Sequence, residues 1–412
     1  MRIIVIGAGV VGVASAWYLA ADGHQVSVLD RAAGPAMETS FGNAGGVCPG
    51  FAGPWAAPGL PLKALGWMVS QHAPLRLRPQ ADPAQWRWLV AFLRNCTVAR
   101  FAQNKARMQR MAHYSRACLE ALRAETGIAY DHATEGVLQV FHTEAEREGG
   151  RRAAEVLRGL GIPHRLVDRD QALTIEPALS QRVGADGTRL VGGLHLPTDE
   201  TGDCHIFTRA LAELLASRGV TFRFGCEVSA LRARSGRVVA LESSAGEMTA
   251  DAFVMATGPW APRLLKPLGI TVPVYPVKGY AMSGRISDMA AAPRSSVMDE
   301  HSKIMITRLG DRLRAAGSAE IAGFAPGIPE AARDALRARV RELFPAATDY
   351  DAVTFWAGYR PMTPDGPARI GPTALGGLFL NVGHGSNGWT QACGTGRVLA
   401  DMVAGRPPEV MP

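Results

Sequence analysis

A glycine turn between two short apolar segments opens the chain and restricts its fold more than any other feature. Apolar residues over 3–6 lead into the turn, a helix-compatible stretch follows, and a second apolar segment over 25–29 ends on Asp30. The turn has the spacing G-x-G-x-x-G, formed by Gly7, Gly9 and Gly12. Strand, glycine turn, helix, strand and acidic residue in this order make the βαβ unit that binds dinucleotides. The sequence therefore predicts an α/β domain with a nucleotide site at this turn.

Each part of the turn has a separate mechanical role. Gly7 permits the tight turn, Gly9 lets a diphosphate approach the backbone, and Gly12 lets the helix pack closely on the strand. The helix N-terminus offers unpaired N–H groups to the diphosphate, and Asp30 is placed to accept hydrogen bonds from ribose hydroxyls. The adjoining residues predicted to contact the nucleotide are Ile6, Val10, Val11 and Arg31. The alternative, a glycine-rich turn that binds nothing, is disfavoured because every element of the unit is present.

Further glycine motifs indicate which dinucleotide is bound. A strand pattern over 253–256 ends in Thr257 and Gly258, and another over 377–382 runs into a glycine-rich segment before a helix. A loop over 39–46 has the small residues needed where backbone passes close to a flat ring. A ligand that touches all these segments must be long and extended. This favours FAD over NAD.

The residues predicted to bind this cofactor come from each of these segments. The loop contributes Ser40, Asn43, Ala44 and Gly45, and the backbone of Val228 is expected to meet the adenine. The strand ends contribute Thr257 and Gly258. The last segment and the start of its helix contribute Gly383, His384, Gly385, Ser386, Asn387, Gly388, Trp389 and Thr390. We expect His384 to shape the loop rather than to transfer protons.

The order of the patterns predicts two domains, with the nucleotide domain interrupted twice. With 412 residues, 47% of them hydrophobic, the chain can bury a core for each domain. An α/β, Rossmann-like FAD-binding domain is predicted over 1–62, 196–272 and 352–412. An α+β substrate-binding domain with an antiparallel sheet is predicted over 63–195 and 273–351.

Two local predictions concern the junction between these domains. A strand over 192–197 is expected to re-enter the first domain. A helix over 205–217 follows it, with Thr201 or Asp203 as its N-terminal cap.

Composition excludes several classes of function. The net charge is +7, but the arginines are scattered and no basic run alternates with aromatic residues, so nucleic-acid binding is not expected. The six cysteines have no metal-ligand spacing, which predicts reduced thiols and no metal site. No apolar run is long enough to span a membrane. The expected location is the cytoplasm, with peripheral contact to the cytoplasmic face of the inner membrane left open.

Several segments together resemble a known family. They are VVGVASAWYLAADGH, PWAAPGLPLKALGWM, RNCTVARFAQNKARM, LPTDETGDCHIFT, YPVKGY, WAGYRPMTPDG and GHGSNGWTQACGTG. In this order they resemble the bacterial D-amino acid dehydrogenases, FAD enzymes of the wider D-amino acid oxidase and glycine oxidase superfamily. The resemblance covers nearly the whole chain. It implies a FAD-binding domain of the glutathione-reductase type.

The resemblance also implies a substrate site. The superfamily binds the substrate carboxylate through an arginine in an Arg-Pro-x-Thr-x-Asp-Gly segment, which corresponds to Arg360. An arginine fork makes two charge-assisted hydrogen bonds to a carboxylate. The alternative for Arg360 is a structural ion pair with Asp365. Tyr280 is expected to contact the same carboxylate, with Tyr275 as the alternative.

The chemistry implied is oxidative deamination of D-amino acids, with D-alanine as the representative substrate. Hydride transfer from the α-carbon to flavin N5 gives an imino acid, which water hydrolyses to a 2-oxo acid and ammonia. The helix that begins near Trp389 is expected to stabilise negative charge on the non-covalently bound flavin. Electrons then pass to a quinone or another respiratory acceptor.

Departures from the family pattern leave alternatives open. Ser386, Asn387 and Tyr359 stand where the family is expected to have threonine, leucine and leucine. These positions adjoin the expected flavin and carboxylate sites, so the preferred amino acid is open. One alternative is an oxygen-using oxidase or dehydrogenase of glycine, sarcosine, D-proline or hydroxyproline. Another is a flavin subunit of a heteromeric complex.

Overall fold

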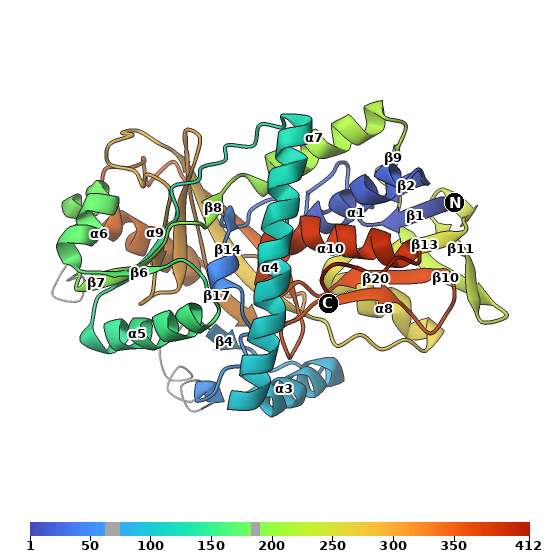
Figure 1. Cartoon of the computed structure of the whole chain (residues 1–412), viewed down its shortest axis with the longest axis horizontal. Helices are drawn as coiled ribbons and strands as arrows, with labels where there is room; N and C mark the ends of the chain where they lie inside the picture. Colours follow the sequence, from blue (N-terminus) through green and yellow to red (C-terminus); the bar gives the residue numbers. More distant parts are fainter. Residues whose placement is uncertain (62–74, 183–189) are drawn as a thin grey trace.

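The computed structural model describes residues 1–61, 75–182 and 190–412. Most of the strands in these residues belong to two large sheets, and the long helix α4 (Val98–Thr126) runs down the middle of the molecule as seen in Figure 1. The predicted boundary between residues 62 and 63 lies outside the described residues, as do residues 62–68 of the PWAAPGLPLKALGWM segment. Within the described ranges, no helix is long and apolar enough to cross a membrane.

The first sheet contains the predicted βαβ unit at its centre. Its order is β19-β20-β13-β1-β2-β9, and all pairings are parallel except that of β19 with β20. Its strands are β1 (Arg2–Ile6), β2 (Gln25–Leu29), β9 (Thr221–Arg223), β13 (Ala252–Met255), β19 (Arg369–Pro372) and β20 (Leu378–Val382). Ile3 and Val5 pack with helices on one face, and Ile4 and Ile6 pack on the other. Burial on both faces explains why β1 reads as a continuous apolar run.

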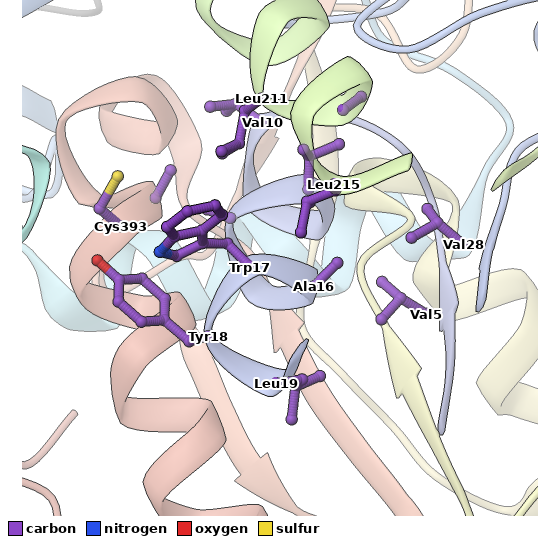
Figure 2. Close-up of a cluster of buried hydrophobic side chains, with 14 of the residues drawn as sticks. Val5, Val10, Ala16, Trp17, Tyr18, Leu19, Val28, Leu211, Leu215 and Cys393 are labelled. Carbon is purple, nitrogen blue, oxygen red and sulfur yellow. The ribbon is translucent and has the colours of Figure 1, made fainter. Parts of the chain in front are cut away.

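Helices cover one face of this sheet and a small antiparallel sheet covers the other. The helices are α1 (Val10–Ala21), α7 (Cys204–Ser217) and α10 (Gly388–Val403). The opposite face carries β10 (Val228–Arg234), β11 (Arg237–Ser243), β12 (Gly246–Thr249) and α8 (Ala261–Leu265). Figure 2 shows Trp17 and Tyr18 of α1 beside Cys393 of α10, with Leu211 and Leu215 of α7 on the other side. A Cβ on Gly396 would lie 3.0 Å from the Ala14 carbonyl oxygen, so this glycine lets α10 pack closely on α1.

The start of α7 resolves one of the predictions left open. The Asp203 carboxylate accepts hydrogen bonds from the N–H groups of His205 at 2.8 Å and Ile206 at 3.0 Å. Asp203, not Thr201, is therefore the cap. Short 3₁₀ turns complete the connections: η1 (Pro49–Phe51), η2 (Pro177–Gln181), η4 (Gly258–Trp260), η5 (Lys266–Leu268) and η6 (Gly385–Asn387).

The second sheet is mainly antiparallel, with the order β18-β14-β17-β16-β15-β5-β7-β6 and β4 paired to β17. Only the β15–β5 and β17–β4 pairings are parallel among the residues described. Its strands are β4 (Leu75–Leu77), β5 (Val137–Phe141), β6 (Arg165–Val167), β7 (Gly192–Leu196), β14 (Tyr275–Arg285), β15 (Ser296–Asp299), β16 (Ile304–Leu309), β17 (Arg312–Ile321) and β18 (Thr354–Met362). A two-residue pair, β3 (Gly46–Val47) with β8 (Glu200–Thr201), lies outside both large sheets.

Two strands belong to a different sheet from the one expected. β7 pairs with β5 and β6, so the expectation that this strand re-enters the first domain is wrong. β18 pairs with β14 from Met362 to Thr354, although the predicted division places 352–412 in the FAD-binding domain. Strand patterns in sequence do not reveal which sheet a strand joins, because the pattern of burial is the same in either sheet.

The helices of the second half begin and end at clear sequence signals. α3 (Pro83–Asn95) starts at the Asp82 cap with proline in its first turn, and α4 starts at Thr97 and ends at Gly127, where φ is +66°. These signals are those expected for helix ends. The remaining helices are α5 (Glu144–Gly159), α6 (Arg169–Ile175) and α9 (Glu330–Leu343). α9 packs on the face of the second sheet that carries Tyr280.

Candidate active site

A cavity of about 780 Å³ collects nearly all the predicted site residues. Every predicted cofactor residue lines it except Gly12 and Gly383, and Arg360 and Tyr280 border it as well. Its walls come from the N-terminal turn, the 38–48 loop, the ends of β13 and β20, and one face of the second sheet. The discontinuous segments predicted to touch one extended ligand therefore do meet in space.

The three glycines of the turn are required for different reasons. A Cβ on Gly7, where φ is +109°, would lie 2.6 Å from the Ala256 carbonyl oxygen, and one on Gly12 would lie 1.9 Å from the Gly7 oxygen. Packing within the protein alone excludes side chains at these two positions. A Cβ on Gly9 would meet only Ser40 Oγ, at 3.4 Å, which is an ordinary contact. Packing alone therefore does not require glycine at position 9, and the reason that we propose for it is a ligand in the cavity.

The start of α1 is open to an anion. Gly9 is the N-cap residue, no side chain of the described residues caps the helix, and the first turn contains no acidic residue. The Val10 N–H donates to Ser40 Oγ at 3.1 Å, which ties the 39–46 loop to the helix start. The helix dipole and the remaining N–H groups face the cavity, which suits a diphosphate.

Asp30 directly follows β2, and backbone N–H groups hold its carboxylate in place. Its Oδ2 accepts from the Ala8 N–H at 2.6 Å and its Oδ1 from the Ala32 N–H at 2.8 Å. The oxygens of an ionised carboxylate have further lone pairs for ribose hydroxyls. Beside it, the Arg31 guanidinium lies 4.2 Å from the centre of the Trp260 ring.

The start of α10 forms the other end of the cofactor site. The Thr390 hydroxyl accepts from the Cys48 N–H at 3.1 Å, so this helix start is fixed to the segment that follows the glycine loop. His384 is buried, and burial lowers its pKa to about 4. The ring is therefore uncharged at neutral pH, and its Nε2 lies 3.1 Å from Thr395 Oγ1. These contacts suit a residue that shapes the loop.

The residues present fit FAD. Two helix starts, α1 and α10, contribute to one long cavity, with an acidic residue at the nucleotide side and small residues along the loop between them. Gly9 leaves open the space that a diphosphate would fill. FAD combines a diphosphate with a ribose and a flat ring, and this set of groups matches all three.

Arg360 extends from β18 under the cavity and has no acidic partner in the part of the chain that the structure describes. Its Nη1 donates to the Ser318 carbonyl oxygen at 2.9 Å, and burial lowers its pKa to about 10. Among the described residues, no carboxylate lies within ion-pair distance of its guanidinium. Asp365, the alternative partner, instead pairs with Arg369 at 2.7 Å. The guanidinium therefore remains cationic at neutral pH and free to bind an anion from the cavity.

The backbone makes room for this guanidinium. Gly279 lies opposite Gly358 on the neighbouring strand, and a Cβ on Gly279 would lie 2.4 Å from Arg360 Nη1. Ser318, whose carbonyl accepts the Arg360 hydrogen bond, has the left-handed φ of +53°. Non-glycine residues in this region cost energy and cluster at functional sites. None of these three residues was among the predicted site residues, although the facing glycines in YPVKGY and WAGYR were a usable signal.

The structure does not bring the Tyr280 hydroxyl to Arg360. Tyr280 pairs with Ala357, three residues from Arg360 on a strand of regular register, so the two side chains point to opposite faces of the sheet. The Tyr280 hydroxyl donates to Glu320 Oε2 at 2.5 Å. Tyr275, the alternative, packs against Trp88 and does not line the cavity. Tyr359 also lies outside the lining, with its hydroxyl donating to the Ala325 carbonyl oxygen at 3.0 Å.

Asp199 lies behind the cavity wall and gives a testable pH dependence. It is fully buried, its Oδ1 accepts from the Gly50 N–H at 3.2 Å, and burial raises its pKa to about 7. Between pH about 4 and 7 the folded protein therefore keeps a proton that the unfolded chain has released. As the pH rises through this window, this group should lower the free energy of unfolding by about 1.4 kcal/mol per pH unit.

Replacing Asp199 with asparagine should remove the contribution of this carboxyl to the slope of unfolding free energy against pH. The slope is measured by denaturant unfolding between pH 4 and 8. Glu176 is a matched comparison, because burial also raises its pKa to about 7 and it lies in another part of the fold. Glu176→Gln should reduce the slope by a similar amount. An Asp199→Asn variant with the wild-type slope would contradict the assignment.

Comparison with known proteins shows similarity over nearly the whole chain. The model of the family described as FAD dependent oxidoreductase matches residues 2–402. A D-amino acid dehydrogenase of Cereibacter sphaeroides is 52% identical over 410 residues, covering 100% of this chain and 93% of the relative. A D-amino acid dehydrogenase of Bradyrhizobium diazoefficiens is 49% identical over 410 residues, covering 100% and 96%.

A solved structure has the same fold. Glycine oxidase from Geobacillus kaustophilus superposes with a TM-score of 0.76 at 24% identity, covering 100% of this chain and 96% of the other. At this identity the likeness concerns the fold alone. This likeness and the full-length matches confirm the predicted fold class, and the full-length matches confirm the enzyme class and FAD as cofactor. The chain belongs to the family of FAD dependent oxidoreductases and, within it, to the D-amino acid dehydrogenases.

Proposed function

We propose that the protein oxidises D-amino acids, with D-alanine as the representative substrate, to 2-oxo acids and ammonia. The observation that carries this proposal is Arg360, a cavity-facing guanidinium with no carboxylate partner among the described residues. Such a group is suited to the α-carboxylate of an amino acid. The preference for the D-isomer rests on the names of relatives about 50% identical to this chain.

The roles of the chain's own residues follow from their positions. FAD, when bound, supplies the hydride-accepting chemistry that converts an amino acid to an imino acid. Arg360 would hold the carboxylate and so fix the direction of the α C–H bond. Water would then hydrolyse the imino acid to the 2-oxo acid and ammonia. We assign the carboxylate contact to Arg360 alone, because the Tyr280 hydroxyl is bonded to Glu320 on the other face.

The substrate's amino group would react in its neutral form. An ammonium group beside Arg360 would find no carboxylate among the described residues to balance its charge. His384 is buried, uncharged at neutral pH and in contact with Thr395, so it is not suited to remove the proton. The proton would leave to water. The start of α10, with its positive dipole end, would stabilise negative charge on the bound cofactor.

We further propose a quinone or a similar respiratory acceptor as the electron acceptor. A quinone dissolved in a membrane would require contact with the membrane surface. The net charge of +7 favours such contact with anionic lipid. Sedimentation with anionic vesicles, compared with neutral vesicles and with high salt, would test this attachment.

The experiment that tests the function is anaerobic bleaching of the flavin absorbance with a panel of D- and L-amino acids, followed by a quinone analogue or oxygen. Bleaching by D-alanine and related D-amino acids, with rapid recovery only on quinone, is the expected result. Bleaching only by glycine, sarcosine or proline derivatives, with peroxide formed in air, would replace the proposal with an oxidase. No bleaching by the chain alone but bleaching within a larger assembly would identify a subunit of a complex.

A further inference from the structure

The charged residues that line the cavity fall into separate groups, and Arg360 stands apart from the others. One group lines the nucleotide side: Asp30, Arg31, Glu38, Glu227 and Arg263. A second, Glu300 with Lys303, lies beyond the end of β15, and there Glu300 is bonded to both Lys303 and Gln139. Within the described part of the chain, the cavity lining near Arg360 contains no other charged side chain that contacts it.

Apolar side chains surround Arg360 instead. The Arg360 guanidinium carbon lies 5.7 Å from the centre of the Trp55 ring. Leu75 of β4 is paired in register with Ala319, the residue after Ser318, whose carbonyl oxygen accepts the Arg360 hydrogen bond. Trp55, Leu60 and Leu75 all line the cavity and pack against one apolar cluster that contains Ala319. These three side chains therefore form one wall beside the guanidinium.

We propose that Trp55, Leu60 and Leu75 form the pocket for the substrate's side chain, and that Trp55 sets the upper limit on its size. The pocket would accept uncharged, apolar side chains. This inference rests on the proposed function, since it places the substrate carboxylate on Arg360. In an amino acid held there, the side chain and the carboxylate are attached to the same α-carbon, so the residues around the guanidinium meet the side chain first.

The physical basis of selection is desolvation. A charged side chain that enters this wall leaves water and finds no partner of opposite charge among the described residues, which is costly. An apolar side chain gains by leaving water, until the Trp55 ring blocks it. Glu300 is the carboxylate of the cavity lining that a basic substrate side chain would have to reach. Its carboxylate is already bonded to Lys303 and Gln139, and β15 is two strands away from β17, about 10 Å at the usual strand spacing.

The first test is Trp55→Ala, with kcat/KM measured for D-phenylalanine and D-alanine. We expect the ratio of the two values to rise at least tenfold, because pocket contacts of this size change specificity by about 10- to 200-fold. The matched control is Trp86→Ala, since Trp86 lies on the exposed side of α3, 48% exposed and outside the cavity lining. The control should leave the ratio unchanged.

The second test introduces a charge into the wall. Leu75→Asp should lower kcat/KM for D-leucine at least tenfold and raise the ratio of D-lysine to D-leucine. Leu77→Asp is the control, because Leu77 lies on the same strand but is 39% exposed and does not line the cavity. A readout without turnover uses unreactive carboxylates, propanoate against 3-phenylpropanoate, followed by the change each causes in the flavin absorbance. Trp55→Ala should tighten binding of the larger acid relative to the smaller one.

The outcomes separate this inference from the proposed function. One outcome is that the wild type turns over D-amino acids while Trp55→Ala and Leu75→Asp, at full flavin content, keep the wild-type ratios of kcat/KM. That result would overturn the pocket and leave the proposed function standing. No turnover of any amino acid by the wild type would overturn the function, and the carboxylate-binding series would then still test the wall. If Trp55→Ala lacks flavin, Trp55→Phe is used in its place. A wild-type ratio of kcat/KM for D-phenylalanine to that for D-alanine in this variant would count against the inference.

Discussion

Replacing Arg360 with alanine should lower kcat/KM for a D-amino acid by about 10²- to 10⁴-fold while leaving the FAD content unchanged. Two charge-assisted hydrogen bonds of about 1.5–3 kcal/mol each would be lost, and about 1.4 kcal/mol corresponds to a factor of ten. The loss should appear mainly in KM, because the carboxylate is bound equally before and during hydride transfer. Removing Arg360 leaves no buried carboxylate unpaired among the described residues, so the fold should persist.

Two further variants make this result specific. Arg360→Lys keeps a charge but lacks the planar fork, so it should recover part of the lost binding. Arg285→Ala is the control, since Arg285 lies at the exposed end of β14 with its side chain 87% exposed. It should behave as the wild type. An Arg360→Ala enzyme with near-wild-type kcat/KM would show that the carboxylate binds elsewhere.

Replacing Gly9 with valine should abolish FAD binding without unfolding the protein. A Cβ at this position meets only Ser40 Oγ, at 3.4 Å, so the first atom of the side chain fits the empty protein. The branched side chain would instead occupy the space that we assign to the diphosphate. The purified variant should be colourless, with a far-UV circular dichroism spectrum like that of the wild-type apoprotein.

Two glycine substitutions serve as references for this variant. Gly34→Val should retain flavin, because a Cβ there meets nothing within 4 Å and Gly34 does not line the cavity. Gly12→Ala should instead destabilise the fold, since its Cβ would lie 1.9 Å from the Gly7 oxygen. Full flavin occupancy in Gly9→Val would contradict the assignment of the diphosphate site.

Features encoded locally could be predicted from the sequence. The βαβ unit was set by apolar runs and glycines, and the helix over 205–217 by its cap, within a few residues of one another. The candidate cofactor residues could be named because each motif contains a glycine suited to close approach of the ligand. Nearly all of them line one cavity, and their contacts with FAD stay a prediction.

Features that depend on strand register could not be predicted. The face on which Tyr280 lies follows from its pairing with Ala357, and a shift of one residue would reverse it. The choice of Arg369 over Arg360 as the partner of Asp365 likewise depends on how β18 and β19 join different sheets. Trp55 lies in a loop without periodicity, so nothing in the sequence distinguished it from a packing residue.

The order of strands in the first sheet has a consequence for biosynthesis. Ile3 of β1 pairs with Val26 of β2, but its other neighbour is Ala252 of β13. At about 5–20 residues per second, a ribosome needs on the order of 12–50 s to synthesise the chain from Ile3 to Ala252. One edge of β1 stays unpaired during that time. Thr390, at the start of α10, emerges later still. The nascent chain therefore exposes an unpaired strand edge, a site for aggregation, for much of its synthesis, and we expect FAD to be captured late, largely after translation.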